Sequence, residues 1–139
     1  LIINSKKIEK SVPLELKIGY DYNFDNYVYK LSVHSNNVRF SRNYDDELID
    51  LASIKNKKLV LRYWCSGDRF KPLGMNGTQK ISDYLINNKI NLFQKDEQAV
   101  LTADDQIIWV CGQRIDDSVK VSYSTKNILR IRRKLKGVG

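Results

Sequence analysis

Polar and apolar residues alternate strictly over residues 14–22, where every even position carries an apolar side chain. This period of two is typical of a strand with one buried face. Residues 23–26 supply turn-forming Asn and Asp, and the alternation resumes over residues 27–33, so the pattern predicts a β-hairpin. After a second turn we expect a shorter strand through Val38 and Phe40.

In the middle of the chain, residues 59–65 form a nearly continuous apolar run. Just before it, residues 48–54 fit a short strand and a helical turn equally well. A basic turn at residues 55–58 marks the expected boundary between a leading β-rich segment, residues 1–58, and a second segment, residues 59–139. The apolar run predicts a central strand buried on both faces, and we expect the two segments to form one compact unit.

A stretch rich in Gly and Pro follows that run and leads into an amphipathic helix. We expect this helix over residues 78–88, because Ile81, Tyr84 and Leu85 fall on one face at helical spacing. Thr78 is the expected N-cap. The Gly residues before it force specific turns on the backbone, and exposed N–H groups at such a helix start favour anions.

Apolar runs predict further strands in the last part of the chain. Residues 98–103 and 106–112 are joined by two Asp residues, and because this pair is not Asn-Gly we expect a slightly longer loop. Alternation predicts another strand over residues 119–123 and a last one over residues 127–133. The whole pattern therefore predicts an α+β fold of mainly antiparallel strands, sandwich-like, with one principal helix after the Gly-rich loop.

The charge of the chain is strongly basic and unevenly distributed. The 139 residues carry 24 Lys and Arg against 16 Asp and Glu, a net charge of +8. Residues 1–68 contribute +2 of this excess and residues 69–139 contribute +6. Clustered Lys and Arg are the electrostatic footprint of nucleic-acid binders, although many basic domains bind no nucleic acid.

Several classes of protein and site are disfavoured. No apolar run approaches the ~20 residues of a membrane helix, and the two cysteines, Cys65 and Cys111, lie in apolar runs typical of buried, reduced thiols. One His and two Cys do not build a zinc site, and His34 lacks a recognisable nucleophile partner. We therefore expect no catalytic residue, no metal and no cofactor in this chain.

The Gly-rich stretch also carries a family resemblance. The segment Gly67-Asp-Arg-Phe-Lys-Pro-Leu-Gly-Met-Asn-Gly-Thr-Gln-Lys-Ile-Ser-Asp83, here called the signature segment, resembles the signature of bacterial tRNA(Ile)-lysidine synthetases near their C-terminus. The likeness continues through Ile107-Ile-Trp-Val-Cys-Gly-Gln-Arg-Ile-Asp116 and covers about residues 59–133. The Ser-Gly-Gly-x-Asp-Ser loop with which this family binds ATP is absent from the sequence. Because the chain also begins at Leu1 rather than Met, we expect it to be a piece of a longer protein.

The resemblance implies a cytoplasmic ligase that uses ATP, with Mg as a further cofactor, to join lysine to the wobble cytidine of tRNA(Ile). Both cofactors and the catalysis would belong to an N-terminal catalytic domain missing here. The implied partners are tRNA(Ile), gripped at its acceptor stem, and that catalytic domain, with no membrane involved. Whether the whole protein forms a homodimer is left open.

Six basic residues are the expected tRNA contacts: Arg69, Lys71, Lys80, Arg114, Lys120 and Lys126. For Asp68 we favour a structural role, in which a salt bridge and an Asx-turn hold the bend. Arg114 could pair with either of two nearby aspartates instead of contacting RNA.

A second hypothesis for the chain as a whole is a basic interaction module that docks on its own catalytic domain or on a partner subunit. Steep salt dependence would distinguish RNA binding from apolar docking.

Overall fold

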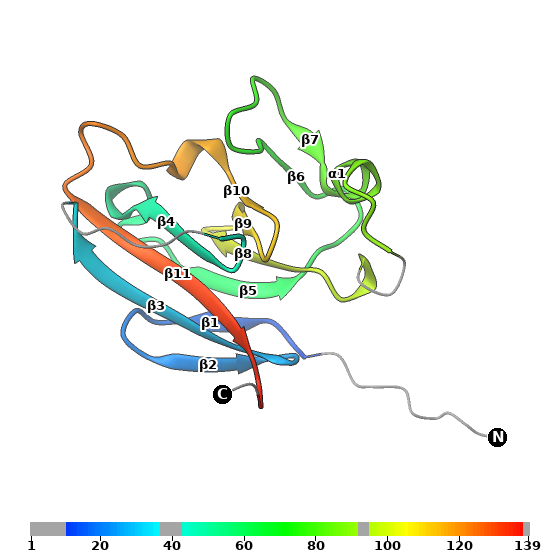
Figure 1. Cartoon of the computed structure of the whole chain (residues 1–139), viewed down its shortest axis with the longest axis horizontal. Coiled ribbons are helices and arrows are strands. Elements are labelled where there is room, and N and C mark those ends of the chain that lie inside the picture. The colour runs from blue at the N-terminus through cyan, green and yellow to red at the C-terminus, as the bar shows by residue number, and fades with distance from the viewer. Residues whose placement is uncertain (1–10, 37–42, 92–94, 138–139) are drawn as a thin grey trace.

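Two antiparallel sheets packed face to face form the body of the molecule (Figure 1). The computed structural model describes residues 11–36, 43–91 and 95–137, so the strand expected through Val38 and Phe40 lies outside the described residues. The strand order is β1-β5-β8-β9-β10 in the larger sheet and β2-β3-β11-β4 in the smaller one.

The larger sheet consists of β1 (Leu14–Leu16), β5 (Leu59–Tyr63), β8 (Ala99–Ala103), β9 (Gln106–Val110) and β10 (Arg114–Ile115). The smaller sheet consists of β2 (Asp21–Phe24), β3 (Tyr27–Ser35), β4 (Asp46–Asp50) and β11 (Asn127–Leu135). A two-stranded ribbon, β6 (Arg69–Phe70) and β7 (Gln79–Lys80), precedes the helix α1 (Ile81–Asn87), and two short 3-10 helices are η1 (Leu51–Ile54) and η2 (Asp117–Val119).

Strands from both halves of the chain meet in each sheet. In the larger sheet β1 pairs with β5, and in the smaller one the long strand β11 lies between β3 and β4. The N-terminal strands are thus joined by hydrogen bonds to the strands that follow residue 59.

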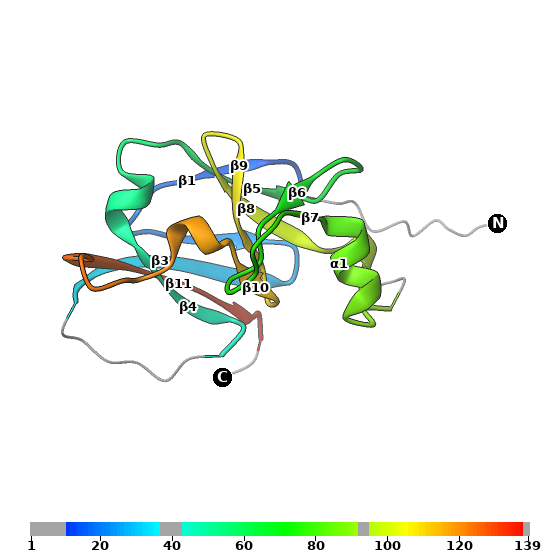
Figure 2. The same ribbon diagram turned by 90° about the horizontal axis from the view of Figure 1, so that it is seen from above.

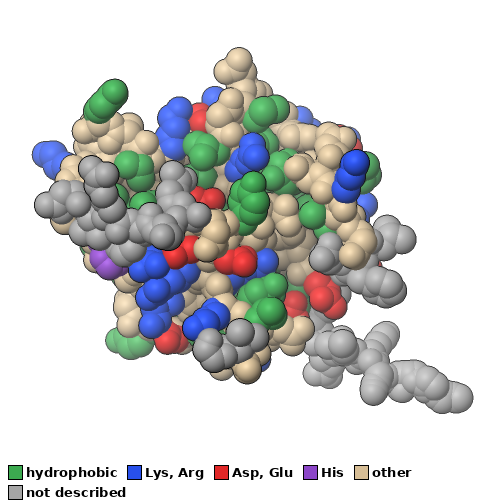
Figure 3. Space-filling model, in the orientation of Figure 1, with side chains coloured by type: hydrophobic (Ala, Val, Ile, Leu, Met, Phe, Trp, Pro, Cys, Tyr) green, Lys and Arg blue, Asp and Glu red, His purple; other side chains and the backbone are tan. Residues whose placement is uncertain are grey.

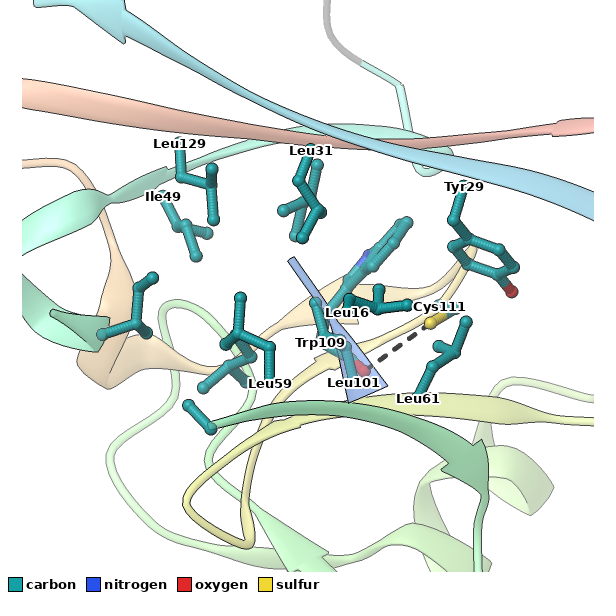
Figure 4. Close-up of a cluster of buried hydrophobic side chains, with 14 of the residues drawn as sticks. Leu16, Tyr29, Leu31, Ile49, Leu59, Leu61, Leu101, Trp109, Cys111 and Leu129 are labelled. Carbon is teal, nitrogen blue, oxygen red and sulfur yellow. Dashed lines mark hydrogen bonds between the residues drawn. The ribbon is translucent and has the colours of Figure 1, made fainter. Parts of the chain in front are cut away.

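The main core fills the space between the two sheets, with Trp109 at its centre (Figure 4). Trp109 is fully buried and meets the ring of Tyr29 edge to face, with the ring centroids 6.2 Å apart. Leu31 and Leu129 approach from the smaller sheet and Leu101 from the larger one. Burial of large apolar and aromatic side chains of this kind is the main stabilising contribution.

A second core covers the opposite face of the larger sheet. Ile81, Tyr84 and Leu85 of α1 are buried there together with Phe70 of β6, and they pack on a sheet surface that includes Val100. Figure 2 shows α1 at one end of the molecule, with the β6–β7 ribbon next to it. The expected fold class, mainly antiparallel with one helix after the Gly-rich loop, is confirmed, and so is the predicted buried stripe of the helix.

The strand expected over residues 14–22 is wrong as a single element. It breaks between Leu16 and Asp21, where Gly19 has a φ of +99°. The chain leaves the larger sheet at this break and enters the smaller one, so Ile18 and Tyr20 are exposed although they continue the alternation. Residues 48–54, ambiguous in sequence, divide between the end of β4 and η1.

The start of the helix also differs from the prediction. Thr78 is not the N-cap: the helix begins at Ile81, and Lys80 occupies the cap position without a side-chain hydrogen bond. The reason is that Gln79 and Lys80 are held in extended conformation by pairing with Phe70 and Arg69.

Two further predictions fail in the last part of the chain. Ala103 pairs with Gln106, so the connection is the tight two-residue turn, in which Asp104 and Asp105 both have positive φ. Residues 119–123 form no strand, because η2 and a loop occupy this stretch.

The two cysteines differ in exposure. Both thiols are free, but only Cys111 is buried, because β5 ends two residues before Cys65 and leaves that side chain exposed. Burial raises the pKa of the Cys111 thiol to about 12, so it stays protonated at neutral pH.

Two consecutive aspartates fasten the signature segment to the larger sheet. The buried Asp116 accepts hydrogen bonds from the backbone N–H of Lys71, at 2.7 Å, and from Ser118. Asp117 accepts from the backbone N–H of Gly74 at 3.0 Å. This bond lowers the pKa of Asp117, and the nearby Lys side chains lower it further.

The absence of a side chain at Gly112 leaves room for the side chain of Arg133 to be buried against the larger sheet. Gly112 has a φ of +77°, and a Cβ there would collide with the guanidinium of Arg133. That guanidinium lies 3.8 Å from the ring centroid of Tyr27 and donates to Asp45 at 2.8 Å and to the hydroxyl of Tyr29 at 3.3 Å. The end of β11 is thereby attached to β3 and to the turn before β4, and the guanidinium packs against Gly112.

We predict that Gly112→Ala lowers the free energy of unfolding by about 2–4 kcal/mol, from the left-handed backbone and from displacement of Arg133. The matched control is Gly19→Ala, which also has positive φ but nothing within 4 Å of the added Cβ, and which should lose only about 1–2 kcal/mol. Urea denaturation measures both, and equal losses would contradict the close packing of Gly112 on Arg133.

A second prediction concerns acid stability. Because folding lowers the pKa of Asp117, its contribution is complete above the ordinary value of 3.8 and is lost as the pH falls below it. Asp117→Asn should therefore show a smaller loss of urea stability between pH 6 and pH 2.5 than the parent. The exposed Asp83→Asn serves as the control, and a parent-like pH dependence in Asp117→Asn would disprove the anchoring role.

Candidate nucleic-acid interface

The bend at the start of the signature segment is held by an ion pair. Arg62 of β5 donates two hydrogen bonds to the carboxylate of Asp68, at 2.9 and 3.2 Å, and the same carboxylate accepts from the backbone N–H of Cys65 at 2.7 Å. The hydrogen bond from Arg62 to Asp68 raises the pKa of the guanidinium. The salt bridge expected for Asp68 is confirmed, with Arg62 as the partner. The expected Asx-turn is not what holds the bend, because the carboxylate accepts from the N–H of Cys65, three residues earlier, rather than from the residue two positions later.

The β6–β7 ribbon brings two of the expected contact residues together. Arg69 is directly opposite Lys80 in the ribbon, and both are exposed. The guanidinium of Arg69 donates to Thr78 Oγ1 at 3.3 Å. Within the described part of the chain neither cation has a carboxylate partner, so both charges are available to an external anion.

Two other expected residues converge on one carboxylate. The ammonium groups of Lys71 and Lys120 lie 3.7 and 3.4 Å from Asp117 Oδ2. Their side chains remain 39% and 54% exposed, against 14% for Asp117. Two positive charges share one negative charge here, so the cluster keeps an excess of positive charge at the surface.

Arg114 is half-buried in β10, and its positive charge acts on Tyr84 of α1. Burial raises the pKa of the Tyr84 hydroxyl, and the charge of Arg114 partly offsets that rise. Neither Asp116 nor Asp117 forms a salt bridge with Arg114 among the described residues. Arg114 is therefore not paired with the aspartates that hold Lys71 and Lys120.

Lys126 is separate from this group. It precedes β11 and lines a hollow together with Leu51 of η1 and with Lys55. The structure thus brings Arg69 and Lys80 together and joins Lys71 to Lys120 through Asp117, but leaves Lys126 in different surroundings. Lys and Arg side chains are visible among apolar and polar ones over the upper part of the molecule in Figure 3.

The sequence patterns do not predict that Lys71 and Lys120 pair with Asp117. The sequence feature that could have indicated it is the position of Asp117 directly after Asp116 and three residues before Lys120. The patterns also predict only a turn at residues 55–58, because nothing local indicates that Lys55 and Lys57 border a hollow.

Within residues 11–36, 43–91 and 95–137, no group of three His, Cys, Asp or Glu side chains could hold a metal ion. His34 forms a hydrogen bond of 2.8 Å with Ser32 on the same strand. In the same ranges, no helix has the length and apolar character needed to cross a bilayer.

Comparison with solved structures supports the fold. A crystal structure of a TilS C-terminal domain superimposes with a TM-score of 0.78, covering 91% of this chain and 98% of the other at 21% identity. At this identity the match establishes the fold alone.

Comparison with curated proteins finds relatives named tRNA(Ile)-lysidine synthase. The one from Bacteroides thetaiotaomicron is 39% identical over 74 residues, which is 53% of this chain and 17% of the relative. The one from Clostridium acetobutylicum is 31% identical over 103 residues, 74% of this chain and 22% of the relative. The chain thus spans about a fifth of the length of these relatives.

The family model described as the TilS substrate C-terminal domain matches residues 59–132. This range contains the signature segment, both aspartates that fasten it, and all six expected contact residues, at 69, 71, 80, 114, 120 and 126. Since the match covers more than half of the residues, the chain belongs to the TilS substrate C-terminal domain family.

Proposed function

We propose that this chain is the tRNA-binding C-terminal portion of a tRNA(Ile)-lysidine synthase. The observation that carries the proposal is the exposed pair Arg69 and Lys80, held side by side by the signature segment without a described carboxylate partner. Unpaired cations on a rigid ribbon are suited to phosphate oxygens, because their positions are fixed before the RNA arrives.

The neighbouring cations extend this surface. Lys71 and Lys120 share a single carboxylate, and the charge of Arg114 acts on Tyr84 of α1. An RNA phosphate that approached Lys71 or Lys120 would compete with an exposed ion pair, and such pairs are weak in water. These five residues are the proposed contacts, and Lys126 would meet the RNA elsewhere.

The acceptor stem of tRNA(Ile) is the proposed target. A-form RNA presents phosphates and 2′-hydroxyl groups across a shallow minor groove, and proteins recognise it mostly through shape and backbone contacts. Basic side chains on a ribbon and on neighbouring loop and strand positions fit that mode of binding. They would hold the stem while the distant anticodon reaches a catalytic domain.

For the whole protein we propose the activity that its relatives' names state. The synthase would use ATP to activate the wobble cytidine of tRNA(Ile) and would then attach lysine to it. ATP, Mg and the reacting groups would belong to a catalytic domain that is not part of these 139 residues, so this chain supplies binding and orientation alone.

The test is binding of the 139-residue chain to tRNA(Ile) and to an unrelated tRNA across a salt series. We predict that Arg69→Ala/Lys80→Ala weakens binding and reduces the slope of log affinity against log salt by about 2, one for each lost phosphate contact. Its far-UV circular dichroism and urea midpoint should match the parent, because both side chains are exposed.

The matched control is Lys134→Ala/Lys136→Ala, which removes the same charge from two exposed positions at the end of the chain. It should retain most of the affinity and the salt slope. Equal losses in both double variants would reduce the interaction to nonspecific charge attraction. Absence of tRNA binding by the parent at low salt would favour the alternative, a module that docks on its own catalytic domain.

A further inference from the structure

A hollow of about 550 Å³ opens at the end of the sandwich away from α1. It lies between η1 and the loop that precedes β11, which Figure 2 shows at the opposite end of the molecule from α1. None of the expected contacts in the signature segment lines it. Its size is within the range of small-ligand sites.

The floor of this hollow is apolar. Leu51 and Ile54 of η1 and Leu59 at the start of β5 form it, and the last two are also members of the main core. A floor fixed by core packing keeps its shape, so it can accept a flat aromatic group without rearrangement.

The rim is cationic. Lys55, Lys57 and Lys126 line the hollow and are exposed, and none of them forms an ion pair within the described part of the chain. The described lining residues include no Asp or Glu, while Asn56 and Asn127 add side-chain amides. An apolar floor, amide groups and an uncompensated positive rim complement a group that combines an aromatic ring with a phosphate.

An exposed aromatic side chain stands next to the hollow. Tyr123 is fully exposed, and its neighbour Ser124 lines the hollow. The turn that carries Tyr123 is closed by two hydrogen bonds between Ser122 and Thr125, of 2.9 and 3.1 Å, and Thr125 is buried. An aromatic ring presented on a fixed turn beside lysines is a stacking platform for a nucleic-acid base.

We propose that this hollow and Tyr123 bind two successive unpaired nucleotides of RNA. One base enters over the apolar floor, the phosphates meet Lys55, Lys57 and Lys126, and the next base stacks on Tyr123. A base-paired duplex does not fit this mode, because its bases are stacked inside the helix. The inference rests on the proposed function for the source of the RNA, a tRNA with unpaired as well as paired nucleotides.

The experiment is fluorescence anisotropy of the 139-residue chain with fluorescein-labelled hexauridylate, a single-stranded RNA. Tyr123→Ala should weaken binding roughly 5- to 100-fold, the range observed for loss of one stacked base. Lys55→Gln/Lys57→Gln should lower the salt slope by about 1.4, as expected for two single-strand phosphates. An unlabelled 12-base-pair blunt RNA duplex should compete poorly for this site.

Controls separate this site from general charge attraction and from the signature segment. Tyr44→Ala removes another exposed tyrosine, and Lys134→Gln/Lys136→Gln removes two exposed lysines, all away from the hollow; both should bind hexauridylate like the parent. Arg69→Ala/Lys80→Ala should also keep its hexauridylate affinity while losing tRNA affinity, so the two proposals fail separately.

Three results would overturn the inference. The first is a hexauridylate affinity of Tyr123→Ala within twofold of the parent, and the second is an equal loss of affinity and salt slope in the two double-lysine variants. The third is the absence of hexauridylate binding by the parent at low salt. The last result would assign the hollow to docking of another part of the protein.

Discussion

Strands β8 and β9 bury both of their faces, and the rest of the molecule is arranged around that requirement. All five residues of β8 and four of the five in β9 are buried. A sheet without a solvent face needs apolar cover on each side. The smaller sheet supplies it on one side, and α1 with the β6–β7 ribbon supplies it on the other.

This constraint explains why the signature segment is both rigid and exposed. Its apolar members, such as Phe70 and Ile81, are drawn into the second core, while the intervening residues must pass over the surface. Backbone hydrogen bonds to Asp116 and Asp117 fix the path of the loop. The carboxylates therefore serve mainly to hold the loop, and Arg69 can remain without one.

The distribution of paired and unpaired cations separates structural from binding roles. Arg62 and Arg133 are partly or largely buried and have carboxylate partners, so they stabilise local structure. The exposed cations without described carboxylate partners include those of the β6–β7 ribbon and those of the hollow beside η1. The first is suited to the phosphates of a paired stem. The second adds an apolar floor and an aromatic side chain, which suit unpaired bases.

The sequence by itself determined the features that depend on neighbouring residues. Alternation revealed the β2–β3 hairpin region, and helical spacing revealed the buried stripe of α1, because burial periodicity is local. A continuous apolar run revealed β5, but the expected burial on both faces is wrong, since only Leu59 and Leu61 of this strand are buried. The signature segment likewise identified the family from consecutive residues. Only the tertiary structure decided the break at Gly19, the pairing that removes Lys80 from the helix, the sharing of Asp117 and the separate position of Lys126. Each of these depends on contacts between residues far apart in the chain, and no local pattern encodes which distant partner a side chain will meet.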